Sequence, residues 1–115
     1  MQKEYDKVKG YKGESQTVKF LLDKKYKIYT QNYKNKVGEI DIIAQDKDTI
    51  VFIEVKARET LAFGRPSEAV NYYKQNKIRK VAQIFLIKNN LLDSKVRFDV
   101  IEVVGQNINH IENAF

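Results

Sequence analysis

The sequence contains no cysteine, which excludes disulfide bonds, thiolate metal sites and a cysteine nucleophile together. A chain without cysteine suits the reducing cytosol, so a cytoplasmic location is expected. The sequence also has no apolar run approaching the roughly 20 residues that span a bilayer. Residues 1–12 are polar and lysine-rich, unlike the apolar core of a secretory signal. No membrane partner is therefore expected.

The length of 115 residues fits one domain and leaves no room for a second core. Hydrophobic residues make up 43% of the chain, which is enough to build a packed core and argues against disorder throughout. We therefore expect a single domain over residues 1–115, in which residues 1–12 form a flexible arm.

Positive charge exceeds negative charge, with 21 lysines and arginines against 15 acidic residues and a net charge of +6. A basic excess attracts polyanions and speeds their encounter with the protein. Nucleic acid is the commonest partner of this kind, and an anionic membrane surface is the rival. Solvated surface lysines that bind nothing explain the charge equally well.

Apolar periodicity predicts the order helix, three strands, helix, strand, which indicates an α/β protein with one sheet flanked by helices. The expected elements are a helix over 14–25, strands over 27–33, 39–44 and 49–56, a helix from Pro66-Ser67 to about Asn89, a strand over 95–104, and a short strand or docked tail over 109–115. The polar stretch 74–77 is a candidate break in the second helix, and Tyr73 falls on that helix's apolar face.

The strand over 49–56 is the strongest of these elements. It is apolar on both faces near its middle, which predicts a central position with cover on both sides. The short gap after the strand over 39–44 predicts an antiparallel hairpin.

Charged residues interrupt these apolar strands. Side chains alternate along a strand, so Glu54 and Lys56 point to the same face. If the hairpin closes through Lys47-Asp48, Asp41 lies directly opposite Glu54. A register slip of one residue would move Asp41 to the other face and dismantle the cluster.

Two facing carboxylates repel unless a cation lies between them. Lys56 could supply this charge, and so could a divalent ion such as Mg²⁺, which binds one or two carboxylates and keeps waters and phosphates as its other ligands. Glu14, at the start of the first helix, is a candidate further ligand, and Glu39 lies on the same face as Asp41. The structural alternative is a cross-strand salt bridge from Lys56 to Asp41 or Glu54.

Two stretches, Gly-Glu-Ile-Asp-Ile-Ile-Ala over 38–44 and Val-Phe-Ile-Glu-Val-Lys-Ala-Arg over 51–58, resemble the D…(D/E)-x-K signature of the restriction-endonuclease-like superfamily. More narrowly, the chain resembles the YraN family of small bacterial proteins, related to archaeal Holliday junction resolvases. The likeness continues through residues 13–14, 63–66, 68–70, 77–78, 97–100, 110–111 and 113–115.

The resemblance implies a core of order αβββαβ with a mixed central sheet. It makes Asp41 and Glu54 ligands of Mg²⁺ or Mn²⁺, and Lys56 the residue that orients or activates the attacking water. Glu14 matches the helix-one glutamate of the resolvase-like branch. The chain departs from the superfamily pattern in lacking the proline before the aspartate, where Ile40 stands.

Basic residues gather around or after this cluster: Arg58, Arg65, Lys74, Lys77, Arg79 and Lys80. Of these, Arg58, Arg65 and Lys77 are the candidate nucleic-acid contacts. A solvated helix face is the alternative. Tyr72 and Tyr73 are candidates for stacking on bases, although a tyrosine at helical spacing is more often part of the core. The lone histidine, His110, is expected to be structural.

The leading functional hypothesis is a metal-dependent endonuclease that hydrolyses phosphodiester bonds in branched or damaged DNA. The resemblance also implies a homodimer, because a four-way junction presents two equivalent cuts. The alternatives are a nucleic-acid-binding module that keeps the fold without catalysis, and an interaction protein whose charge is incidental.

Overall fold

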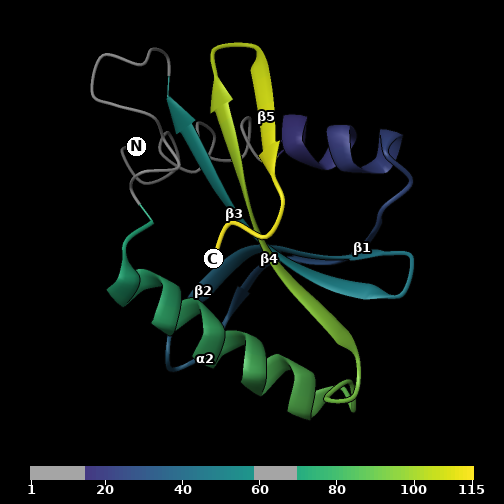
Figure 1. Cartoon of the computed structure of the whole chain (residues 1–115), viewed down its shortest axis with the longest axis vertical. Coiled ribbons are helices and arrows are strands. Elements are labelled where there is room, and N and C mark those ends of the chain that lie inside the picture. The colour runs from purple at the N-terminus through teal and green to yellow at the C-terminus, as the bar shows by residue number, and fades with distance from the viewer. Residues whose placement is uncertain (1–14, 59–69) are drawn as a thin grey trace, which may run out of the picture.

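A computed structural model describes residues 15–58 and 70–115 of the chain (Figure 1). The expected N-terminal arm and two predicted site residues, Glu14 and Arg65, lie outside the described residues, as does the predicted helix start at Pro66-Ser67. A continuous helix from there to about Asn89 is nevertheless wrong, because Asn71 is extended and caps a helix that begins at Tyr72. In the described ranges, no helix is both long enough and apolar enough to cross a membrane.

The observed elements follow the predicted order and add a paired strand at the end. After a first helix described over residues 15–23, they are β1 (Lys27–Lys34), β2 (Glu39–Asp46), β3 (Thr49–Arg58), α2 (Tyr72–Lys88), β4 (Lys95–Val104) and β5 (Asn107–Ile111). The mixed α/β class is confirmed, and the architecture is compatible with the αβββαβ core. Both alternatives for the C-terminal segment are found: β5 is the short strand, which begins two residues earlier than expected, and the tail after it docks on β4, where the N–H of Ala114 donates to the carbonyl oxygen of Phe98 at 2.8 Å.

The five strands form one sheet in the order β1-β2-β3-β4-β5. Strand β3 pairs antiparallel with β2 and parallel with β4, which makes the sheet mixed. Helix α2 lies between the two parallel strands in the chain, as is usual for the crossover connection of a parallel pair. The predicted central position of β3 is therefore confirmed.

Alternate residues of β3 enter two separate hydrophobic clusters. Ile50 and Phe52 pack in the same cluster as Val81 and Phe85 of α2. Val51 and Ile53 belong to the other cluster, together with Leu21 of the first helix. Because side chains alternate along a strand, each face of β3 is covered by a different helix. This double cover explains why its middle is apolar at every position.

Helix α2 runs without interruption from Tyr72 to Lys88, so the predicted break over 74–77 is wrong. The side chain of Asn71 caps the helix by accepting a hydrogen bond from the backbone N–H of Lys74 at 2.9 Å. Lysine and glutamine are good helix formers, so a polar first turn needs no break. The placement of Tyr73 on the apolar face is also wrong, because the residue is 72% exposed and the buried face begins at Ile78.

Candidate metal and nucleic-acid site

The turn between β2 and β3 determines which side chains face each other. Asp46 pairs with Thr49, so the loop consists of Lys47 and Asp48, as predicted. The ladder continues to the pair Ile42 and Ile53. The ladder ends there, and Asp41 and Glu54 lie one residue beyond this pair on their strands; both line the same cavity, so they share the face that the site requires.

The carboxylate of Asp41 reaches across to the backbone of β3. Its Oδ2 atom accepts a hydrogen bond from the N–H of Val55 at 2.8 Å. Val55 lies between Glu54 and Lys56, so this bond fixes the strand at the point where both charged side chains leave it. Glu54 and Lys56 alternate with Val55 and share the face of Phe52, which packs with α2.

Glu54 is a buried carboxylate, with 6% of the residue exposed. Its Oε1 atom lies 3.0 Å from Nζ of Lys74 and 3.7 Å from Nζ of Lys56. An unpaired charge at this depth would cost several kcal/mol, roughly, so the two ammonium groups are what make the ionised form tolerable. The sequence grouped Lys74 with the surrounding cations, but gave no signal that it contacts Glu54.

The two lysines influence each other. Burial, followed by the neighbouring ammonium of Lys74, lowers the pKa of Lys56 below its ordinary value. Burial also opposes the charged form of Lys74, but its contacts with the Lys56 amine and the Glu54 carboxylate outweigh burial and raise its pKa. Lys74 therefore keeps its proton, and with it its positive charge, to a higher pH than Lys56 does.

A cavity of about 350 Å³ opens between the sheet and α2. Its lining residues are Gly38, Glu39, Asp41 and Glu54 from the sheet side and Lys74, Lys77, Ile78 and Val81 from the helix. One cavity is therefore bordered by the two predicted metal ligands, Asp41 and Glu54, and by Lys77, a predicted contact for nucleic acid. Lys56 lies beside it, in contact with Glu54.

The structure thus brings together four of the predicted site residues: Asp41, Glu54, Lys56 and Lys77. Arg58 is the last residue of β3, and its side chain lies outside the described part of the chain, as do Glu14 and Arg65. These three remain predictions.

The donor set fits a hard divalent cation. Asp41 and Glu54 offer carboxylate oxygens from adjacent strands, and Mg²⁺ and Mn²⁺ prefer oxygen ligands. In the structure Lys74 balances the charge of Glu54 at 3.0 Å. A lysine side chain is long and flexible, so it can turn toward a phosphate when another cation takes over this charge.

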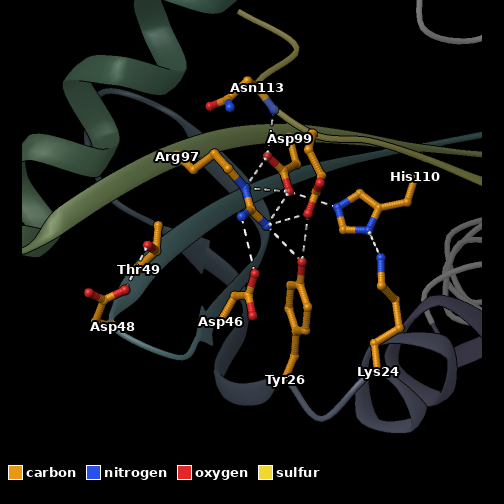
Figure 2. A network of polar contacts seen from close by, with 10 residues as sticks. Lys24, Tyr26, Asp46, Asp48, Thr49, Arg97, Asp99, His110 and Asn113 are labelled. Carbon is orange, nitrogen blue, oxygen red and sulfur yellow. Dashed lines mark hydrogen bonds and ion pairs between the residues drawn. The ribbon is translucent and has the colours of Figure 1, made fainter.

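A second polar cluster lies on the opposite face of the sheet, around Arg97 (Figure 2). The guanidinium contacts Asp99 at 3.0 Å, Asp46 at 3.1 Å and Glu112 at 3.3 Å. It also donates to the Tyr26 hydroxyl at 2.7 Å. These contacts tie β4 to the end of β2, to the segment before β1 and to the residues after β5.

His110 belongs to the same cluster. Its Nε2 atom lies 2.7 Å from Asp99 Oδ2, and its Nδ1 atom lies 2.9 Å from Nζ of Lys24. Because an ammonium group can only donate, Nδ1 accepts from Lys24 and Nε2 donates to Asp99. The sequence predicted a structural role for His110, and these contacts place it on the face away from the cavity.

Asp99, His110 and Glu112 bring ligand atoms within 4.8 Å of one another, a spacing suited to a metal ion. However, Arg97 already contacts both Asp99 and Glu112. Its guanidinium supplies the positive charge that a metal would bring. We therefore interpret this cluster as an ion-pair network that holds the fold together.

The network makes stability depend on pH. Burial alone would raise the pKa of Asp99, but hydrogen bonds from His110, Arg97 and the Asn113 backbone N–H outweigh it and lower the pKa. A lowered carboxylate pKa stabilises the fold above the unfolded value of about 4, and this stability is lost as pH falls through the folded value. Urea unfolding should therefore give the wild type a higher free energy of unfolding than Asp99→Asn. This difference should be largest at neutral pH and should decrease below about pH 4. A difference in free energy of unfolding that stays constant on acidification would contradict this prediction.

The sequence profile of the uncharacterised protein family UPF0102 matches residues 13–103, a range that contains Asp41, Glu54, Lys56 and Lys77. A UPF0102 protein of Clostridioides difficile (strain 630) is 51% identical over 112 residues, covering 96% of this chain and 98% of that protein. One from Caldanaerobacter subterraneus subsp. tengcongensis is 45% identical over 122 residues and covers all of both chains. One from Persephonella marina is 43% identical over 108 residues, with 94% and 93% covered. The resemblance to the YraN family is thereby confirmed, and the chain belongs to the uncharacterised protein family UPF0102.

Proposed function

We propose that this protein is a metal-dependent nuclease that hydrolyses phosphodiester bonds in DNA. One observation carries the proposal. Asp41 and Glu54, from adjacent strands, border the same cavity as Lys74 and Lys77, and Lys56 lies against Glu54. Carboxylates for a cation, lysines for phosphates and an amine beside them are the groups that this reaction needs.

Each residue has a role that follows from its position. Asp41 and Glu54 would hold Mg²⁺ or Mn²⁺, which when bound supplies a Lewis acid for the phosphodiester. The Val55 N–H bond to Asp41 keeps that carboxylate and β3 in a fixed relation, so less reorganisation is needed on binding. Lys56 orients the attacking water from beside Glu54.

Lys74 and Lys77 bind the DNA backbone in this proposal. Both are on α2 and line the cavity wall that faces the two carboxylates. A phosphate between them and the carboxylates would place its scissile bond next to the cation site. Lysine contacts to phosphate position a nucleic acid without reading its sequence.

A non-catalytic DNA-binding module is the second candidate, and one observation favours it. Lys74 already balances Glu54 at 3.0 Å. A chain that kept this ion pair permanently would retain the fold and its basic surface, yet would hold no cation between its carboxylates.

Labelled DNA separates the two candidates. The protein is incubated with linear, nicked and four-way-junction DNA of the same sequence, with Mg²⁺, with Mn²⁺ and with a chelator. A nuclease produces cuts only when metal is present, and faster cutting of the junction identifies branched DNA as the substrate. Salt-sensitive binding that yields no product with either metal would contradict the nuclease and support the module.

A homodimer follows from a branched substrate, because two equivalent cuts need two equivalent sites. We expect light scattering of the complex to give the mass of one junction plus two chains. The mass of one junction plus one chain, at protein concentrations that saturate the junction, would contradict this expectation.

A further inference from the structure

Two tyrosines at the start of α2 contribute little to the core. Tyr72 is 74% exposed and Tyr73 is 72% exposed. Single exposed aromatic rings are common, so exposure alone identifies no site. Their different positions relative to the cavity are what distinguishes the two residues.

Tyr73 lies beside the cavity. Lys77 follows it by one helical turn, and Nζ of Lys77 lies 5.4 Å from the centroid of the Tyr73 ring. Lys77 also lines the cavity that contains Asp41 and Glu54. The ring therefore lies next to the lysine that we assign to the DNA backbone.

Tyr72 is on another side of the helix. Successive residues of an α-helix are separated by about 100°, so Tyr72 lies roughly 160° around the axis from Lys74, which lines the cavity. The two tyrosines thus have nearly equal exposure and adjacent positions in the chain, yet only Tyr73 adjoins the cavity lysines.

We infer, on the basis of the proposed function, that Tyr73 stacks on an unpaired base next to the scissile phosphate. The substrate class is then DNA with unpaired bases beside the cut, such as a bulge or a gap. An exposed ring next to a basic groove is how proteins bind single-stranded segments. The faces of bases inside an intact duplex are covered by their neighbours, so only an unpaired base offers a free face.

The lysines of the cavity wall also favour DNA as the ligand. Lys74 and Lys77 line the α2 wall of the cavity and face the carboxylates of Glu39, Asp41 and Glu54, so a DNA backbone would be bound on the helix side, next to Tyr73. The contact between Lys77 and the ring restrains Tyr73 before DNA binds, because a cation over an aromatic face is attractive. A restrained ring loses less conformational freedom when a base stacks on it.

The test measures binding in chelator, so that no DNA is cut. One probe is a fully paired duplex, and the other is the same duplex with a two-nucleotide bulge that carries 2-aminopurine. We expect the wild type to prefer the bulge and to quench its fluorescence. Tyr73→Ala should weaken bulge binding about fivefold or more and lose the quenching. Tyr73→Phe keeps a stacking ring and should retain both.

The matched control is Tyr72→Ala, which removes an equally exposed ring one position away and should leave bulge binding unchanged. Circular dichroism of all variants checks that α2 still forms. Equal losses in Tyr72→Ala and Tyr73→Ala, or a wild type without preference for the bulge, would overturn the inference.

Failure of the inference and failure of the nuclease proposal give different results. Metal-dependent cleavage by a protein whose Tyr73→Ala variant binds the bulge normally overturns stacking and leaves the nuclease intact. Tyr73-dependent binding without cleavage under either metal supports stacking and overturns the nuclease.

Discussion

Glu54→Gln should reduce metal-dependent DNA cleavage at least about 100-fold, because the substitution keeps the shape of the side chain and removes its charge. The carboxylate is buried between Lys74 and Lys56 and borders the cavity. An amide at this position cannot balance either ammonium, and its neutral oxygen is a weaker ligand for a divalent cation than a carboxylate is. Single-turnover cleavage of labelled DNA in Mg²⁺ measures the effect.

Asp41→Asn should give a similar loss for the same reason. Its side-chain oxygen can still accept the hydrogen bond from the Val55 N–H, so the position of β3 is kept while the charge is lost. This variant therefore separates the charge of Asp41 from its structural contact.

The matched control for both variants is Asp48→Asn, which makes the same change in net charge away from the cavity. Asp48 is in the exposed turn between β2 and β3 and pairs with Lys95. Its cleavage rate should match that of the wild type. If Glu54→Gln cleaved DNA as fast as the wild type, the nuclease proposal would lose its basis.

Arg97→Met should lower the free energy of unfolding by about 3 kcal/mol, because it leaves the buried carboxylate of Asp99 without the guanidinium that balances its charge. The guanidinium side chain is 14% exposed and contacts Asp46, Asp99 and Glu112. Asp99 is completely buried, so water cannot replace the lost contact. This loss is a large part of the ~5–15 kcal/mol that stabilises a typical domain. Urea unfolding at neutral pH measures it.

Lys95→Met provides the control on the same strand, two residues earlier. Lys95 also pairs with an aspartate, Asp48, at 2.9 Å, but both side chains are largely exposed. Exposed pairs contribute little to stability, so the unfolding midpoint should not change measurably. Equal effects of the two substitutions would show that the Arg97 network is as weak as a surface pair.

The sequence by itself determined the part of the site that depends on strand periodicity. A two-residue turn and the alternation of side chains are local properties, and together they placed Asp41 opposite Glu54 and put Lys56 on the same face. Apolar residues at every position of the middle of β3 likewise predicted its central place, because only a strand covered on both faces needs them.

Only the tertiary structure decided how the helix meets the sheet. The contact of Lys74 with Glu54 and the exposure of Tyr73 depend on how α2 rotates about its axis, which is determined by the packing of Ile78, Val81 and Phe85 against the sheet. The Arg97 network joins residues that are up to 86 positions apart, as in the contact of Lys24 with His110. No local pattern encodes such pairs, because they form only when packing brings distant segments together.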